Sequence, residues 1–131
     1  MGIERVRKQI IKGAEKKSQE LGAEMELDKV IASSFKMAEG FFKRGNFTGA
    51  FFMYFKCLKS IALLSIRKKI GDSSISDDEA INIVIEKGLL PLKKSQFDTF
   101  LERFKKVLSR KKLEKNECLD IMALVRRLMR T

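Results

Sequence analysis

The sequence contains no histidine and no tryptophan, and its 131 residues include only one proline and two cysteines. Histidine is the commonest general base in enzymes, so its absence removes the usual histidine-activated nucleophile. Cys57 and Cys118 lie far apart in apolar helical patterns, without the C-x-x-C spacing of redox and zinc sites. We therefore expect two reduced core thiols, no metal, no cofactor and no catalytic residue, and we predict that the chain is not an enzyme.

Proline and strand-like alternation are both scarce, whereas residues that favour helices, such as lysine, glutamate, leucine and isoleucine, dominate. Hydrophobic residues make up 44% of the chain, as in an ordinary globular protein. A length of 131 residues is sufficient to bury a core without disulfides or a structural metal. The composition predicts an all-α protein in which residues 1–131 form a single helical-bundle domain.

Long hydrophobic runs are absent as well. Residues 1–12 mix apolar and charged groups and lack the apolar centre of a signal peptide. The most apolar stretch, residues 50–66, is interrupted by Lys56 and Lys59 and is too short and too charged to span a bilayer. We expect a cytoplasmic protein without a membrane partner.

Apolar residues recur at three- and four-residue spacings along most of the chain, which is the pattern of amphipathic helices. Gly45 follows Arg44 and precedes Asn46, an order that predicts a helix stop, a tight turn and a new N-cap, with antiparallel helices on either side. The expected fold is an up-and-down bundle of four to five core helices plus an N-terminal amphipathic helix. The predicted helices cover about residues 2–21, 27–44, 47–69, 77–87, 95–110 and 116–130.

Acidic residues are outnumbered, 17 against 28 basic ones, which leaves a net charge of +11. Residues 1–17 carry a net charge of +4, residues 18–92 carry none, and residues 93–131 carry +7. This asymmetry indicates an anionic partner, nucleic acid first, although the lysine-rich surface of a heat-adapted protein gives the same composition. The last two predicted helices should be antiparallel, which would divide their cations into two patches. The candidate nucleic-acid-binding residues are Lys105, Lys106, Arg110, Lys111, Lys112, Lys115, Arg126, Arg127 and Arg130.

Ten phenylalanines are present, and six of them fall within residues 41–55, in the hairpin of the second and third predicted helices. Most such rings belong to a core, but this hairpin is richer in aromatic residues than one small core usually needs. An excess apolar patch commonly marks a protein–protein surface, so we expect a homodimer formed through the hairpin. Stacking of nucleic-acid bases on the rings is a third use. The candidate interface residues are Phe47, Phe51, Phe52 and Phe55.

Residues 38–50 read AEGFFKRGNFTGA, and the chain continues through Tyr54-Phe55 to an A-L-L run at residues 62–64. This segment resembles the opening hairpin of the HEPN domain, the higher eukaryotes and prokaryotes nucleotide-binding domain. That hairpin typically has an alanine, a small loop with glycine and asparagine, then a tyrosine and an A-L-L run. The stretch EKGLLP at residues 86–91 is similar to the connector of small stand-alone HEPN proteins. The resemblance covers about residues 27–130 and leaves the N-terminal helix as an addition.

The resemblance implies a bundle of four to five helices that often dimerises. Many members of the family are RNases that have an arginine followed, four to six residues later, by a histidine near the start of the last helix. Arg110 is the nearest arginine, and Lys115, Asn116 and Glu117 stand where the histidine would fall. Other members are non-catalytic and bind nucleotides or RNA, or partner a small nucleotidyltransferase encoded beside them. The chain resembles this second group more closely.

Three functions are therefore open. The first is a non-catalytic HEPN-like binding module that self-associates and binds RNA or another polyanion through its basic terminal segments. The second is a protein-interaction adaptor, or an antitoxin-like subunit of a nucleotidyltransferase or defence complex, in which the lysines serve only solubility. The third is a degenerate ribonuclease that uses Arg110 with Asn116 or Tyr54. We favour the first of these.

Overall fold

The computed structural model describes residues 25–71 and 74–130, and these residues form a bundle of α-helices with no strand among them. The predicted all-α helical bundle is confirmed. Every helix predicted within this part is found, with ends that differ by no more than two residues. The helix predicted at residues 2–21 lies outside the described residues. The observed helices are residues 25–43, α2 (Phe47–Lys69), α3 (Asp77–Glu86), α4 (Lys94–Leu108) and α5 (Lys115–Met129).

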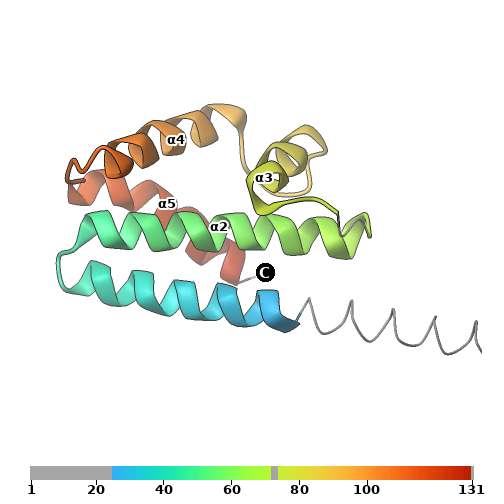
Figure 1. Cartoon of the computed structure of the whole chain (residues 1–131), viewed down its shortest axis with the longest axis horizontal. Coiled ribbons are helices and arrows are strands. Elements are labelled where there is room, and N and C mark those ends of the chain that lie inside the picture. The colour runs from blue at the N-terminus through green and yellow to red at the C-terminus, as the bar shows by residue number, and fades with distance from the viewer. Residues whose placement is uncertain (1–24, 72–73, 131) are drawn as a thin grey trace, which may run out of the picture.

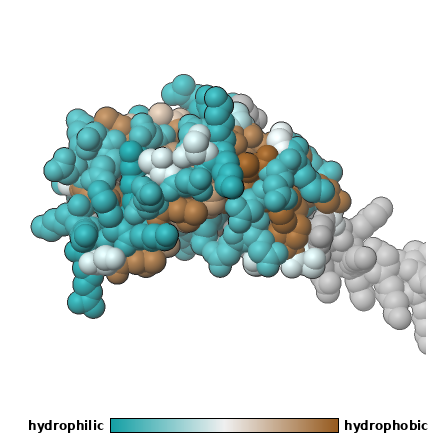
Figure 2. Space-filling model, turned by 90° about the horizontal axis from the view of Figure 1, so that it is seen from above, coloured by the Kyte–Doolittle hydropathy of each residue, from teal (hydrophilic) through white to brown (hydrophobic). Residues whose placement is uncertain are grey.

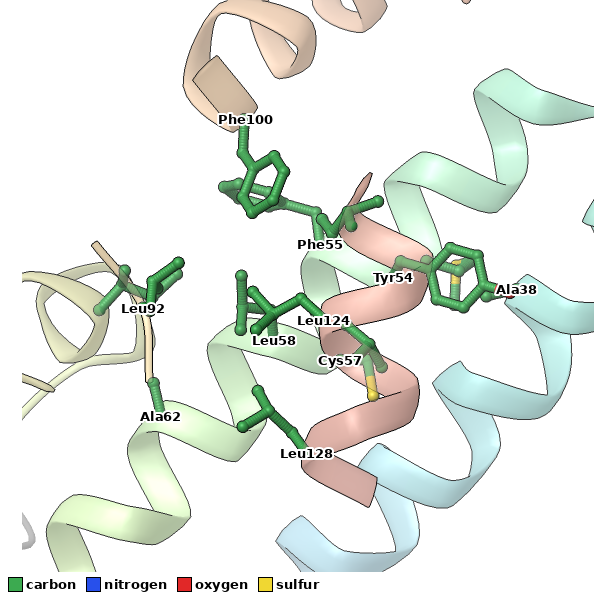
Figure 3. Packing of buried hydrophobic residues seen from close by; sticks show 14 of the residues in the cluster. Ala38, Tyr54, Phe55, Cys57, Leu58, Ala62, Leu92, Phe100, Leu124 and Leu128 are labelled. Carbon is green, nitrogen blue, oxygen red and sulfur yellow. The ribbon is translucent and has the colours of Figure 1, made fainter. Parts of the chain in front are cut away.

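The central helix of the bundle is α2 (Figure 1). The helix of residues 25–43 runs antiparallel along one side of it, and α3, α4 and α5 pack on its other sides. Leu58 of α2 lies next to Leu124 of α5, and Phe100 reaches from α4 toward Phe55 (Figure 3). The core therefore follows α2 along its length, at the places where the surrounding helices meet it.

By length and composition alone, α2 is apolar and long enough to cross a membrane, and it is the one helix in residues 25–71 and 74–130 that passes this test. The helix is longer than residues 50–66, which by themselves are too short to span a bilayer. In the bundle, 56% of its most apolar 18-residue window is buried. A helix surrounded by neighbours on several sides needs this composition for packing, so the core position explains it.

The connection that leads into α2 is built as the sequence predicts. Gly45 has a φ of 77°, and the N–H groups of Gly45 and Asn46 donate to the carbonyls of Phe42 and Phe41, at 3.1 and 2.9 Å. Glycine adopts this left-handed conformation without a Cβ that would collide with the backbone. The Asn46 side chain then accepts a backbone hydrogen bond at 2.9 Å and caps α2.

The end of α4 has the same arrangement, with an arginine in the place of the glycine. Arg110 has a φ of 60° and is the one non-glycine residue with a positive φ in the described part of the chain. Its N–H donates to Val107 O at 3.1 Å, and the N–H of Lys111 donates to Lys106 O at 3.0 Å. This pair of hydrogen bonds closes a helix through a left-handed residue. Because that conformation costs a residue with a Cβ about 1–2 kcal/mol, Arg110 is strained.

Glu39, Tyr54 and Arg126 tie three helices together, and we call these residues the Glu39 network. Arg126 donates from Nε and Nη2 to the two carboxylate oxygens of Glu39, at 2.8 and 2.7 Å, and the Tyr54 hydroxyl donates to Glu39 Oε1 at 2.8 Å. The hydrogen bond from Arg126 is the main reason that the pKa of Glu39 lies below its usual value, and partial burial opposes it. A two-point ion pair has a defined geometry, so the network sets how the three helices lie against one another.

Replacing Arg110 by glycine should raise the free energy of unfolding by about 1 kcal/mol, because glycine adopts the left-handed conformation without strain. Urea denaturation followed by circular dichroism measures the change. Gly45→Ala is the matched control: an added Cβ would meet no atom within 4 Å, so its expected loss of stability comes from the backbone conformation alone. Equal stability of the wild type and Arg110→Gly would contradict the assigned strain.

Glu39→Ala should lower the free energy of unfolding by about 1–3 kcal/mol, because the buried Tyr54 hydroxyl loses its acceptor. Loss of the ion pair with Arg126 adds little to this decrease in stability, since the Arg126 side chain is 39% exposed. Lys59→Ala removes the more exposed ion pair with Asp78 and should cost at most about 0.5 kcal/mol. Urea denaturation measures both variants, and equal losses would show that the network contributes no more than a surface pair.

The Glu39 network should also make stability depend on pH. The pKa of Glu39 in the folded state lies below its ordinary value of 4.5, so folding favours the carboxylate. This stabilisation is complete above the ordinary value and is lost as the pH falls through the folded-state pKa. Glu39→Gln does not ionise but still offers an acceptor to Tyr54. The difference in unfolding free energy between the wild type and Glu39→Gln should therefore shrink below about pH 4.5, and a difference that stays constant in acid would refute this dependence.

Candidate polyanion-binding site

Two connections of the chain meet at one end of the bundle (Figure 1, left). Residues 44–46 link the helix of residues 25–43 to α2, and residues 109–114 link α4 to α5. They come together because α2 and α5 both begin at this end. The N–H of Leu113 donates to Thr48 Oγ1 at 2.9 Å, and the buried Leu113 side chain anchors the second connection on the core.

An open hollow of about 520 Å³ lies between these two connections. Its lining includes Arg44, Phe47 and Thr48 on one side and Arg110, Lys111 and Lys112 on the other. Figure 2 shows this end of the molecule, at the left, covered mainly by hydrophilic residues with smaller apolar areas between them. Two segments far apart in the sequence thus supply cations to one surface.

Six exposed cations lie at this end of the bundle, four of them in the lining of the hollow, and we call the six the basic end. They are Lys43, Arg44, Arg110, Lys111, Lys112 and Lys115. None of them forms a salt bridge with a carboxylate in residues 25–71 or 74–130. The Arg44 guanidinium lies 5.2 Å from the ring centre of Phe41, and the Lys115 ammonium lies 6.0 Å from that of Phe42. Contact with a ring face positions a cation without neutralising it, so the basic end keeps its positive charge.

The nine cations expected to bind nucleic acid do not form one surface. Arg110, Lys111, Lys112 and Lys115 belong to the basic end, and Lys105 is exposed in the last turn of α4. These five are free of salt bridges within the described residues. They are the part of the predicted set that the fold brings near one another.

The other four predicted cations are engaged or lie elsewhere. Lys106 forms an ion pair with Glu117 at 2.8 Å, and Arg126 is held in the Glu39 network. A carboxylate compensates the charge of each of these two side chains. Arg127 and Arg130 lie in the last turn and at the C-cap of α5, away from the basic end. This placement agrees with the expectation that antiparallel packing of the last two helices divides their cations into two patches.

Sequence reasoning missed Lys43 and Arg44 as parts of the site. In the sequence they read as cations at the end of a helix, where they complement the helix dipole. The turn at Gly45 and Asn46 shows where the hairpin ends but not what it ends against. Only the contact between the hairpin and residues 109–114 places Arg44 across the hollow from Arg110.

The four phenylalanines expected at a dimer interface have different positions. Phe51 and Phe55 are 0% and 4% exposed and belong to the core of this chain, which corrects their assignment to an interface. They are buried because α4 covers this face of α2: the ring centres of Phe55 and Phe104 are 4.7 Å apart. Phe47 is half-buried and lines the hollow, and Phe52 is 43% exposed. Of the four, Phe52 offers the most surface to a partner.

The two thiols and the phenol of the described residues are buried. Burial raises the pKa of the Cys57 thiol to about 12 and that of the Cys118 thiol to about 11, so both stay protonated at neutral pH. Burial raises the pKa of Tyr54 as well, and its hydroxyl is bound to Glu39. No group of three His, Cys, Asp or Glu side chains in this part of the chain could hold a metal ion. The basic end offers positive charge and hydrogen-bond donors.

Comparisons of the chain with protein-family models, curated proteins and solved structures found no match in any of the three. The likeness to the HEPN domain remains a prediction from the sequence.

Proposed function

We propose that this chain is a non-catalytic, HEPN-like binding module that holds RNA, or another polyanion, at its basic end. The observation that carries the proposal is the convergence of Arg44 with Arg110, Lys111 and Lys112 around one open hollow. Cations from two separate connections, without salt-bridge partners among the described carboxylates, repel one another. An anion shared by several of them would relieve this repulsion.

Phosphate groups suit these side chains in charge and in geometry. The planar guanidinium of arginine presents parallel donors to two phosphate oxygens, and lysine adds a compact charge. Each neutralised phosphate of a nucleic acid releases condensed counterions, which favours binding at low salt and carries no sequence information. The proposed ligand is therefore a phosphate backbone, recognised without regard to base sequence at these contacts.

The conformation of Arg110 supports a role for its side chain. The other positive-φ residues in the described part of the chain are glycines: Gly45, Gly71 and Gly88. Glycine at position 110 would remove the strain but would also remove a guanidinium from the hollow. Strained residues cluster at functional sites, so an arginine at this position fits a binding role better than a structural one.

The surroundings of the reactive groups favour binding over catalysis. A ribonuclease that combined Arg110 with Tyr54 would need a hydroxyl that is buried and already donates to Glu39. Asn116 is exposed, but its amide does not take up a proton at neutral pH and is a poor general base. The positive charge of the basic end needs no such group in order to bind phosphate.

A second candidate function, the protein-interaction adaptor, is favoured by exposed apolar side chains on the helix of residues 25–43. Val30 and Met37 are 37% and 48% exposed, and their spacing of seven residues places them on one face of the helix. A second copy of the chain, or another subunit, would cover this face. The face does not include the basic end, so an adaptor role is compatible with polyanion binding.

RNA binding measured by fluorescence anisotropy at several salt concentrations tests the first function. The triple variant Arg110→Ala, Lys111→Ala, Lys112→Ala should bind about tenfold or more weakly at low salt, because phosphate contacts are lost. The slope of log affinity against log salt should become shallower by about 2, since each phosphate contact contributes about 0.7–0.9. Circular dichroism checks that the variant remains helical.

The matched control is the triple variant Lys68→Ala, Lys87→Ala, Lys94→Ala, which removes the same charge from exposed positions away from the basic end. Its binding should stay close to that of the wild type. Equal losses in both triple variants would assign the affinity to net charge alone and reject a site at the basic end. A wild-type protein that binds neither RNA nor DNA at low salt would reject the polyanion function and favour the adaptor.

A further inference from the structure

A stack of four phenylalanine rings leads from the core to the surface beside the basic end. The ring centres of Phe97 and Phe55 are 6.4 Å apart, those of Phe55 and Phe104 are 4.7 Å apart, and those of Phe104 and Phe52 are 6.0 Å apart. The successive ring planes differ by 14°, 13° and 18°, so each ring is nearly parallel to the next. The rings come alternately from α4 and α2, and their contacts hold the two helices in register.

The stack is closed at one end and open at the other. Phe97 and Phe55 are 7% and 4% exposed, whereas Phe52 is 43% exposed. Phe104 covers one face of the Phe52 ring, and no other ring contact of Phe52 is found within the described residues. Parallel rings attract one another when they are offset, so the open face of Phe52 is a place where a further planar group would continue the stack.

Two exposed cations lie on the helices that carry this end of the stack. Lys56 follows Phe52 by one turn of α2, and Lys105 follows Phe104 on α4; both are exposed and form no salt bridge with a described carboxylate. Thr48 precedes Phe52 by one turn and lines the hollow of the basic end. Because one helical turn rises by about 5.4 Å, the ring stands next to the proposed phosphate site.

On the basis of the proposed function, we infer that Phe52 stacks an unpaired base and that the polyanion bound at the basic end is a single-stranded nucleic acid. Every base has a planar face that extends a ring stack, whatever the sequence. In a duplex these faces are covered by neighbouring bases, so a paired strand does not offer them. A second copy of this chain suits the surface less well, because Lys56 and Lys105 of two copies would face like charges.

Three probes of equal length distinguish the contribution of the bases to binding from that of the phosphate backbone. They are a single-stranded RNA, the same RNA as a duplex, and an abasic strand that keeps the phosphates. Phe52→Leu removes the planar ring and keeps an apolar side chain, so it should weaken binding of the single strand about five- to a hundredfold. Its binding of the duplex and of the abasic strand should match that of the wild type. Phe52→Trp, which keeps a planar face, should bind the single strand at least as tightly as the wild type.

Leu108→Ala is the matched control, because Leu108 is 65% exposed on the same helix as Phe104 and carries no ring. It should bind all three probes as the wild type does. Circular dichroism checks the fold of each variant, and light scattering gives its mass in the absence of nucleic acid.

Other outcomes would overturn base stacking alone, or base stacking together with the proposed function. If Phe52→Leu binds the single strand as the wild type does, or if the wild type binds the abasic strand as tightly as the RNA, base stacking is overturned and the polyanion function stands. If Phe52→Leu changes the mass of the free protein, the ring belongs to an interface between copies and the inference is overturned. If the wild type binds none of the three probes, the proposed function and the inference fail together.

Discussion

The burial of α2, a helix that is apolar on nearly every side, is the constraint on which the rest of the structure depends. Such a helix is stable in water only when neighbouring helices cover most of its surface. The helix of residues 25–43, together with α3, α4 and α5, provides this cover. Because the first of these helices and α4 both end where α2 and α5 begin, the same packing brings two connections to one end of the molecule.

Apolar burial alone is non-directional, and polar contacts set the relative positions of the helices. The Glu39 network joins the helix of residues 25–43, α2 and α5 through charge-assisted hydrogen bonds of 2.7–2.8 Å. Lys59 and Asp78 connect α2 to α3, and Arg103 and Asp120 connect α4 to α5. In these last two pairs the carboxylate is more exposed than that of Glu39, so solvent weakens the attraction. The Glu39 network, which includes a fully buried hydroxyl, is the stronger determinant of helix orientation.

Features that oppose stability gather at the basic end. Arg110 is strained, the cations around the hollow repel one another, and the nearby ring of Phe52 keeps a face in water. Proteins tend to break the rules of stable folding where they bind or react. An anionic ligand with planar faces would relieve the repulsion and cover the ring. One class of ligand would therefore account for both the unpaired cations and the exposed ring of Phe52.

Local information in the sequence is sufficient for the helices and their ends. The three- and four-residue periodicity, the stop at Gly45 and the cap at Asn46 depend on residues within one or two turns, so they can be predicted without knowledge of the fold. The burial of Cys57 and Cys118 follows from the same periodicity. The charge excess of the last segment is likewise visible in the sequence.

Only some residues of the candidate site can be predicted from the sequence, because its surface is formed by elements that are distant in the chain. Arg110 could be named from its basic neighbours, but Arg44 became part of the site only when the hairpin met residues 109–114. The periodicity of α2 marks nearly every face as apolar, so it does not say which rings are covered. Packing against α4 buries Phe55 and leaves Phe52 exposed. This difference arises from contacts between separate helices, which no local sequence pattern encodes.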